Sequence, residues 1–270
     1  MKTILVHVES GDASEARLLC ALDLARATGA HLSCLAVTPC NQFITSDPFG
    51  GAYALPNVMA VLAEHKEKLR AALEHRLAGE DVSWDYAHVD GHPPAAIASA
   101  SRLADLVVLG KPLAGAAGRE AMSLLGEVVL NVSSPVLAVP EGATGFDAFA
   151  PAAIGWNGSI EAANAVRAAL PLLRLAPSIT VITVEEHDDH DFPQTDIREY
   201  LSRHGLHATM QCLPSGESNI ADVILWTLSR SDAGYLVMGA YGHSRIREYM
   251  FGGVTRRMLS DLPVPLLLAH

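Results

Sequence analysis

Four glycines near the C-terminal end of the chain have the spacing of a phosphate-binding loop. Gly239 and Gly242 follow an apolar stretch that ends at Met238, and after nine further residues Gly252 and Gly253 precede a helical pattern. Glycine lets the backbone approach an anion closely, and the amino end of a helix offers unpaired N–H groups and a positive dipole. The pattern favours a phosphate site. The same spacing also fits a tight turn and a crowded helix start, so that alternative stays open.

Other residues of chemical interest form weaker patterns. The sequence lacks GxSxG, HExxH, GxxxxGK[ST] and paired CxxC motifs, which mark common nucleophilic and metal-dependent enzymes. His187 and His190 stand in the acidic stretch 185–191, whose side chains suit a divalent metal ion, but adjacent carboxylates more often form a solvated loop. We therefore predict no catalytic residue and no metal site.

The elements that must position the glycines occur twice. Each half of the chain reads as five apolar strands that alternate with four helices. Turn formers with little to bury occupy residues 140–145, which places the boundary near residues 141–149. We predict two domains, residues 1–142 and 149–270.

Apolar strands that alternate with amphipathic helices predict an α/β fold in which helices cover both faces of a mainly parallel, Rossmann-like sheet. Half of the residues are apolar and only 18% are charged, which excludes intrinsic disorder. Trp84, Trp156 and Trp226 are expected to pack in the core. In such folds ligands bind beyond the carboxyl ends of the strands, at the switch point of the strand order.

Charge and composition also restrict partners and compartment. The formal net charge of −11 disfavours binding to nucleic acid, because a nucleic-acid binder must neutralise many phosphates. The first residues do not resemble a signal peptide, and we expect no segment that spans a membrane. Four cysteines without CxxC spacing indicate reduced thiols. We expect a cytoplasmic protein.

The glycine spacing, with a strand before it and the Pro-Val-Pro segment 263–265 after it, is similar to that of the universal stress protein family. The likeness covers the whole chain as two tandem repeats, and the second is the better match to the motif. The resemblance implies two five-stranded parallel-sheet domains of the universal stress protein fold. It also implies binding of an adenine nucleotide, ATP or AMP, with Mg²⁺ if ATP is bound.

Carried onto this sequence, the resemblance places phosphates against the glycine backbone, with Val184 and Met238 beside the base or ribose. This chain departs from the family where Asn157 replaces an aspartate and where Gly253 replaces the serine or threonine after the last glycine. Thr255 is our candidate for the missing hydroxyl contact. The predicted nucleotide-binding residues are Asn157, Val184, Met238, Gly239, Gly242, Gly252, Gly253, Val254 and Thr255.

The first repeat departs further from the family. Glu9 stands at the aspartate position, Pro112 follows Gly110 and Lys111 in place of a glycine turn, and the helix start aligns with residues 122–123. A Cβ atom at these positions would crowd a phosphate, and proline lacks an N–H donor. We predict a nucleotide-free repeat with a structural role.

The family resemblance suggests that the closing strands, residues 136–139 and 264–269, pair antiparallel, so that one chain forms an intramolecular pseudo-dimer. Further homodimerisation is compatible with this arrangement. The predicted function is a stress-response protein that senses an adenine nucleotide through its second repeat and presents a surface to a protein partner. The alternative is an interaction protein that acts without nucleotide, in which Asn157 and Gly253 mark a site that no longer binds. A weak ATP hydrolase ranks last, because Asn157 in place of an aspartate leaves no evident general base.

Overall fold

The computed structural model of the protein describes residues 1–39, 55–110, 116–185, 194–216, 219–242 and 253–270. Strands and helices alternate in both halves, as the sequence predicts. The elements of the first half are β1 (Thr3–Val8), α1 (Asp12–Thr28), β2 (His31–Thr38), α2 (Leu55–Leu77), β3 (Trp84–Asp90), α3 (Pro93–Ala100), β4 (Leu106–Gly110), α4 (Ala116–Asn131) and β5 (Val136–Val139). Those of the second half are β6 (Ala152–Gly155), α5 (Ile160–Leu173), β7 (Ile179–Glu185), α6 (Gln194–Arg203), β8 (Ala208–Pro214), α7 (Ile220–Ser229), β9 (Tyr235–Gly239), α8 (Gly253–Asp261) and β10 (Leu266–Ala269).

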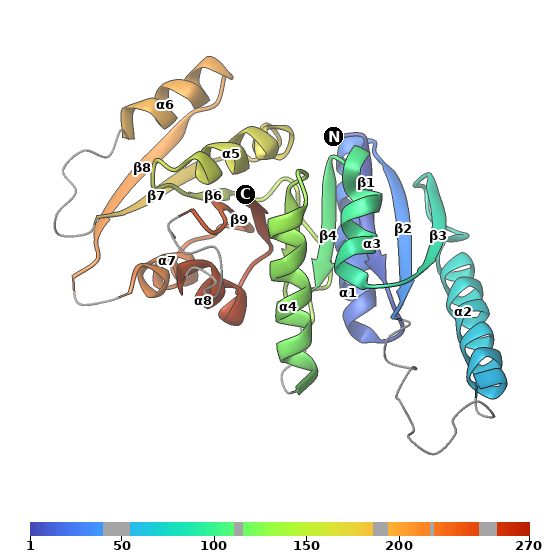
Figure 1. Ribbon diagram of the computed structural model, residues 1–270. Helices are drawn as coiled ribbons and strands as arrows, with labels where there is room; N and C mark the ends of the chain where they lie inside the picture. Colours follow the sequence, from blue (N-terminus) through green and yellow to red (C-terminus); the bar gives the residue numbers. More distant parts are fainter. Residues whose placement is uncertain (40–54, 111–115, 186–193, 217–218, 243–252) are drawn as a thin grey trace.

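The described strands form one ten-stranded sheet with the order β3-β2-β1-β4-β5-β10-β9-β6-β7-β8. Neighbouring strands are parallel within each half, and the two halves lie side by side in Figure 1. β5 and β10 pair antiparallel, with Leu137 opposite Leu267. The predicted antiparallel pairing of the closing strands is confirmed, and it joins the halves into a pseudo-dimer within one chain.

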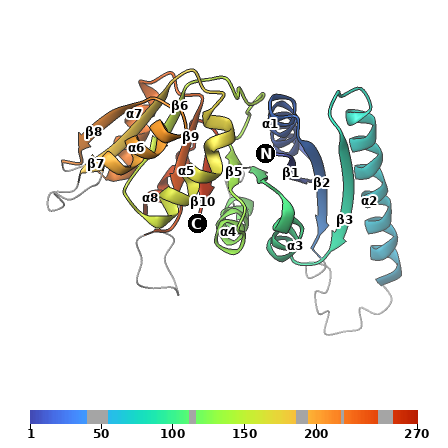
Figure 2. The ribbon, with the colours of Figure 1, turned by 90° about the horizontal axis from the view of Figure 1, so that it is seen from above.

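Both faces of the sheet are buried. On one face α1, α2, α5 and α6 contribute to a hydrophobic cluster, and on the other α3, α4, α7 and α8 contribute to a second cluster. Alternate residues of a strand supply the two clusters: Ile4 and Val6 belong to the first and Leu5 to the second. Figure 2 shows helices on both sides of the strands. This arrangement explains the continuous apolar runs in the sequence, because a strand covered on both faces needs apolar side chains on both.

The segment between the halves packs against both of them. Phe146 is buried, and its ring lies 5.3 Å from the ring of Tyr235 in β9, centroid to centroid. Its backbone N–H donates to Oδ2 of Asp23 in α1 at 3.0 Å. The thiol of Cys20, also in α1, donates to the carbonyl oxygen of Gly145 at 3.2 Å. The predicted boundary region therefore packs between α1 and β9, and we call Gly145 and Phe146 with these contacts the clasp.

The tryptophans divide into two groups. Trp156 is buried and Trp84 packs partly against the core, as expected. The expectation for Trp226 is wrong, because its side chain is 58% exposed on α7. The guanidinium of Arg230 lies 5.2 Å from the centroid of its ring, so a cation–π contact takes the place of core packing.

None of the helices in the described part of the chain is both long and apolar enough to cross a membrane.

Replacing Phe146 by alanine tests the clasp. We expect a loss of about 3 kcal/mol in the free energy of unfolding, because a buried aromatic side chain leaves a cavity between the halves. Phe149→Ala is the matched control: that ring is 60% exposed, and its loss should change stability by less than about 0.5 kcal/mol. Urea unfolding followed by circular dichroism measures both variants. Equal stability losses would contradict the proposed packing.

Candidate functional site

Two of the predicted site residues, Asn157 and Gly239, lie at the carboxyl ends of β6 and β9. β6 lies between β7 and β9, so the chain leaves the two adjacent strands β6 and β9 in opposite directions along the sheet. α5 follows β6 on one face, and α8 follows β9 on the other. This is a topological switch point, where α/β folds open a crevice for ligands. Asn157 follows β6 closely, and Gly239 ends β9.

Asn157 is exposed, and it serves the start of α5. Its Oδ1 atom accepts a hydrogen bond from the Ser159 N–H at 3.2 Å. Ser159 then caps the helix, because its Oγ accepts from the Ala162 N–H at 3.1 Å. The Asn157 amide, which replaces the family's aspartate, thus stabilises the turn that precedes α5.

Gly239 has a packing role that its sequence context does not reveal. A Cβ atom at this position would lie 2.4 Å from the backbone nitrogen of Ala162 and 2.6 Å from the carbonyl carbon of Glu161. The amino end of α5 therefore approaches β9 so closely that only glycine fits. The glycine spacing left a packing role open as an alternative, and this close contact supports that role for Gly239.

Gly242 lies against a carboxylate. A Cβ atom there would be 2.7 Å from Oε2 of Glu161 and 3.2 Å from Oγ of Ser159. Sequence reasoning missed Glu161, although an acidic residue in the first turn of a helix is a recognisable signal, since it complements the helix dipole. Its carboxylate adds a negative charge beside a turn that was predicted to hold phosphates.

The turn between the two glycines is strained. Tyr241 has a φ of 64°, and it is the only non-glycine with a positive φ in the described residues. Its N–H donates to Oγ1 of Thr255 in α8 at 3.4 Å, and Thr255 is only 4% exposed. Burial raises the pKa of the Tyr241 phenol to about 12, so the hydroxyl stays neutral. Thr255, predicted to replace a phosphate contact, holds this turn through its oxygen.

The remaining predicted residues that the structure describes lie in α8 and near the ends of β7 and β9. Gly253 begins α8, and no atom of the described residues lies within 4 Å of the position of an added Cβ. Val184 and Met238 are buried in the hydrophobic cluster that α7 and α8 cover, and Val254 packs against it. Gly252 lies outside the described residues, as do Lys111, Pro112 and residues 186–191 of the acidic stretch. Within the described residues, no group of three or more potential metal ligands is found.

The corresponding crevice of the first half, between β1 and β4, contains an ion pair. Nη2 of Arg17 in α1 donates to Oε1 of Glu9 at 2.6 Å. Arg17 is only 4% exposed, whereas the Glu9 side chain is 51% exposed. A Cβ atom on Gly110 would lie 3.0 Å from Cδ of Arg17. The side chain of Arg17 therefore reaches the carboxyl end of β4.

This ion pair shifts the titration of its neighbours. Burial, together with the charge of Arg17, lowers the pKa of His7 to about 4, and the opposing effect of Glu9 is smaller. Burial would raise the pKa of Glu9, but the charge and hydrogen bond of Arg17 bring it below its usual value. At neutral pH the cluster therefore consists of a neutral imidazole and a charged pair.

The start of α4 corrects one sequence prediction. We expected this helix to begin near residues 122–123, but it begins at Ala116. The α8 helix of the second half is shorter, beginning at Gly253. The backbone N–H groups of residues 122–123 lie inside α4, where a helix uses them for its own hydrogen bonds. The first half therefore has no helix terminus at the position predicted for phosphate.

The sequence model of the universal stress protein family matches residues 1–140. The chain belongs to this family. The match falls on the first half, whereas we expected the second repeat, with its fuller glycine motif, to be the better match. No curated protein matches the sequence.

Solved structures extend the likeness to the whole chain. A universal stress protein from Archaeoglobus fulgidus matches with a TM-score of 0.78 and 15% identity, covering 99% of this chain and 95% of that chain. A protein of unknown function from Pseudomonas aeruginosa matches with a TM-score of 0.59 and 15% identity, covering 99% and 92%. A universal stress protein from A. fulgidus in complex with dAMP is 18% identical, with a TM-score of 0.38, covering 52% and 98%. The full-length matches show that both halves of this universal stress protein share the α/β fold.

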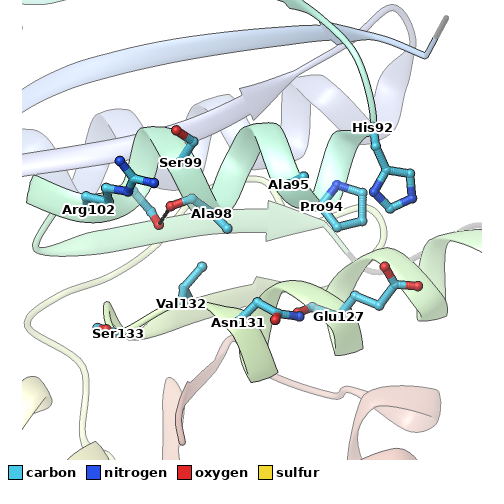
Figure 3. Close-up of a pocket in the computed structure, with 11 residues that line it drawn as sticks. His92, Pro94, Ala95, Ala98, Ser99, Arg102, Glu127, Asn131, Val132 and Ser133 are labelled. Carbon is cyan, nitrogen blue, oxygen red and sulfur yellow. Dashed lines mark hydrogen bonds between the residues drawn. The ribbon is translucent and has the colours of Figure 1, made fainter.

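A groove of about 570 Å³ lies elsewhere in this universal stress protein, between α3 and α4. His92 and Glu127 line one end of it, and Arg102 and Ser133 line the other (Figure 3). Its lining comes from the helices on one face and includes none of the predicted site residues. The groove is therefore separate from the crevice.

Alanine substitutions separate the packing glycine from the open one. Gly239→Ala should lower the free energy of unfolding by about 2 kcal/mol or more, because its Cβ would overlap the backbone of α5. Gly253→Ala should change it by less than about 0.5 kcal/mol, because its Cβ would enter open space. Thermal and urea unfolding measure both. A stable Gly239→Ala variant would disprove the close approach of α5.

The buried imidazole of His7 predicts a pH dependence of stability. The pKa of His7 is about 4 in the folded state and near 6.5 when unfolded, so between these values the unfolded chain binds more protons. Stability should fall as the pH drops from 6.5 to 4, by up to about 1.4 kcal/mol per pH unit from this residue.

His7→Gln should reduce that slope, whereas His75→Gln, which removes an exposed imidazole on α2, should leave it unchanged. Urea unfolding at a series of pH values gives the slopes. Identical slopes for the wild type and His7→Gln would contradict the assignment.

Proposed function

We propose that this protein is a stress-response protein whose second half binds an adenine nucleotide, ATP or AMP, in the crevice between β6 and β9. The observation that carries the proposal is the strained turn at Tyr241, which lies at the switch point and is held by Thr255. A left-handed tyrosine costs of order 1–3 kcal/mol, and such strain is kept mainly at functional sites.

The start of α8 supports the proposed phosphate position. Gly253 opens the helix next to empty space, and the first N–H groups of a helix have no partner within the helix. Backbone donors and the positive end of the helix dipole are the features that suit a phosphate group.

An apolar wall supports the proposed base position. Val184 and Met238 are the next-to-last residues of β7 and β9, which flank β6, and both belong to the hydrophobic cluster on the face covered by α7 and α8. Tyr241 and Val254 pack against the same cluster. An adenine ring is flat and largely apolar on its faces, so such a rim suits it. Asn157, at the end of β6, adds an amide that can both donate and accept hydrogen bonds.

Glu161 sets a condition on this binding. Its carboxylate lies against Gly242, so phosphate groups at the turn meet a like charge. Because Mg²⁺ accompanies ATP, its charge would offset this repulsion, whereas AMP must displace the carboxylate. We propose that nucleotide binding repositions Glu161 and the turn, which changes a surface that a protein partner recognises.

An interaction protein that acts without nucleotide is the second candidate. The close packing of Gly239 on α5 and the carboxylate beside Gly242 favour it, because each fills space beside a glycine predicted for phosphate. The two candidates differ in one property, which is whether a nucleotide stabilises the folded chain.

Mass spectrometry of small molecules released from the purified protein, combined with thermal unfolding in ATP or AMP with and without Mg²⁺, tests the proposal. A nucleotide at about a hundred times its Kd should stabilise the protein by about 2.7 kcal/mol. About one adenine nucleotide per chain supports the proposed site. No released nucleotide and no thermal shift would favour the interaction protein.

Glu161→Gln locates the site. If phosphates lie against Gly242, removal of the like charge should strengthen ATP binding about tenfold in the absence of Mg²⁺, and less in its presence. Glu199→Gln is the control, because Glu199 lies on α6 in an exposed ion pair with Arg203. Isothermal titration calorimetry measures both. Unchanged ATP affinity in Glu161→Gln would place the phosphates elsewhere.

A further inference from the structure

Arg17 stands at the ligand position of the first-half crevice. It starts from α1, and its guanidinium reaches Glu9, which follows β1, while its stem lies over Gly110, which ends β4. β1 and β4 are the adjacent strands from which the first half leaves in opposite directions, as β6 and β9 are in the second half. The buried end of Arg17 thus occupies the switch point of its own half.

At the corresponding position of α5, the second half has a small side chain in place of Arg17. Ala165 holds the same position relative to Asn157 as Arg17 holds relative to Glu9, and Ala165 is fully buried against the sheet. Gly239 faces the backbone of α5, whereas Gly110 faces the methylene groups of Arg17. One crevice is therefore bounded by helix backbone, and the other is filled by a long cationic side chain.

Specific contacts hold the Arg17 side chain in its position. A buried charge is stable only when it is paired, and Glu9 supplies the pair at 2.6 Å. Gly110 must lack a side chain, because an added Cβ would lie 3.0 and 3.2 Å from Cδ and Cγ of Arg17. The backbone of Glu9 is also held in place, because its N–H donates to Oγ of Ser14 at 3.0 Å.

We propose that the first-half crevice is a guanidinium site, formed by Glu9 and Gly110, which the chain fills permanently with its own Arg17. The glycine at the end of β4 is then kept for the arginine stem and not for a phosphate. It follows that the first half is closed to external ligands, and that the chain offers at most one ligand site at its switch points. This inference does not depend on nucleotide binding by the second half.

Chemical rescue tests the proposal. Arg17→Ala should lower the Tm by several degrees, because it leaves a cavity beside the unpaired Glu9 carboxylate. Ethylguanidinium at low millimolar concentration should restore about half or more of that loss, because it fits the cavity and pairs with Glu9. Ethylammonium should restore less, because it lacks the planar set of N–H donors. The readout is the Tm without nucleotide.

Three controls accompany the rescue. Ethylguanidinium should not raise the Tm of the wild type, in which the site is filled, or of the double variant Arg17→Ala/Glu9→Gln, which lacks the carboxylate. It should also fail with Arg203→Ala, since Arg203 belongs to an exposed ion pair that leaves no cavity. Rescue that is absent in Arg17→Ala, or equal in all variants, would overturn the proposal.

A second measurement decides the matter if Arg17→Ala does not fold. Glu9→Gln should lower the Tm more than Glu15→Gln, because Glu9 neutralises a buried arginine whereas Glu15 pairs with the half-exposed Arg76. Equal shifts would overturn the proposal. So would stabilisation of the wild type by inorganic phosphate that disappears in Arg17→Lys, since the crevice would then be an open anion site. Neither readout involves a nucleotide, so failure here is distinct from failure of the proposed function.

Discussion

The antiparallel pairing of β5 with β10 determines the arrangement of everything else in the molecule. Within each half the strands are parallel, so their carboxyl ends meet at one edge of the sheet. Because β5 and β10 run in opposite directions, the carboxyl ends of the two halves lie at opposite edges of the same ten-stranded sheet. The two crevices therefore belong to one sheet but lie at opposite edges of it, so they cannot bind one ligand together. The residues of one crevice could change in evolution without disturbing the other.

The crevices of the two halves differ in what fills them and in the helix beside them. At the first crevice a charge from α1 fills the space, and α4 extends seven residues beyond the start expected from the second half. At the second crevice the helix opposite is short, its first residue faces open space, and the turn before it is strained. A buried arginine held in an ion pair and a long helix favour a fixed structure, whereas a strained turn favours a structure that a ligand can change. In the proposed function, the first half is therefore the rigid half and the second half is the responsive half, which a ligand would change.

The sequence was sufficient for the fold and insufficient for the contents of the crevices. Apolar runs and helical periodicity predicted the alternating elements, because these follow from local pattern. The pairing of residues 136–139 with the closing strand came from the family resemblance. The role of Gly239 depends on a distance of 2.4 Å to a helix that begins almost eighty residues earlier, which no local pattern encodes. Arg17 looks like an ordinary arginine of an amphipathic helix until its neighbours across the strands are known. Trp226 was misplaced for a related reason, because a cation–π partner can take the place of a core.

Tyr241 and Glu161 explain why the responsive half would gain from a ligand. Without one, a left-handed tyrosine in the turn donates a long hydrogen bond to Thr255, and a carboxylate lies against the adjacent glycine. Both features are unfavourable locally and are compensated by the packing of α5 and α8 around them. A ligand shifts such a turn only by the difference between its affinities for the two arrangements. If the proposed nucleotide binds here, its phosphate would supply that difference, because its negative charge would repel the Glu161 carboxylate that lies against Gly242.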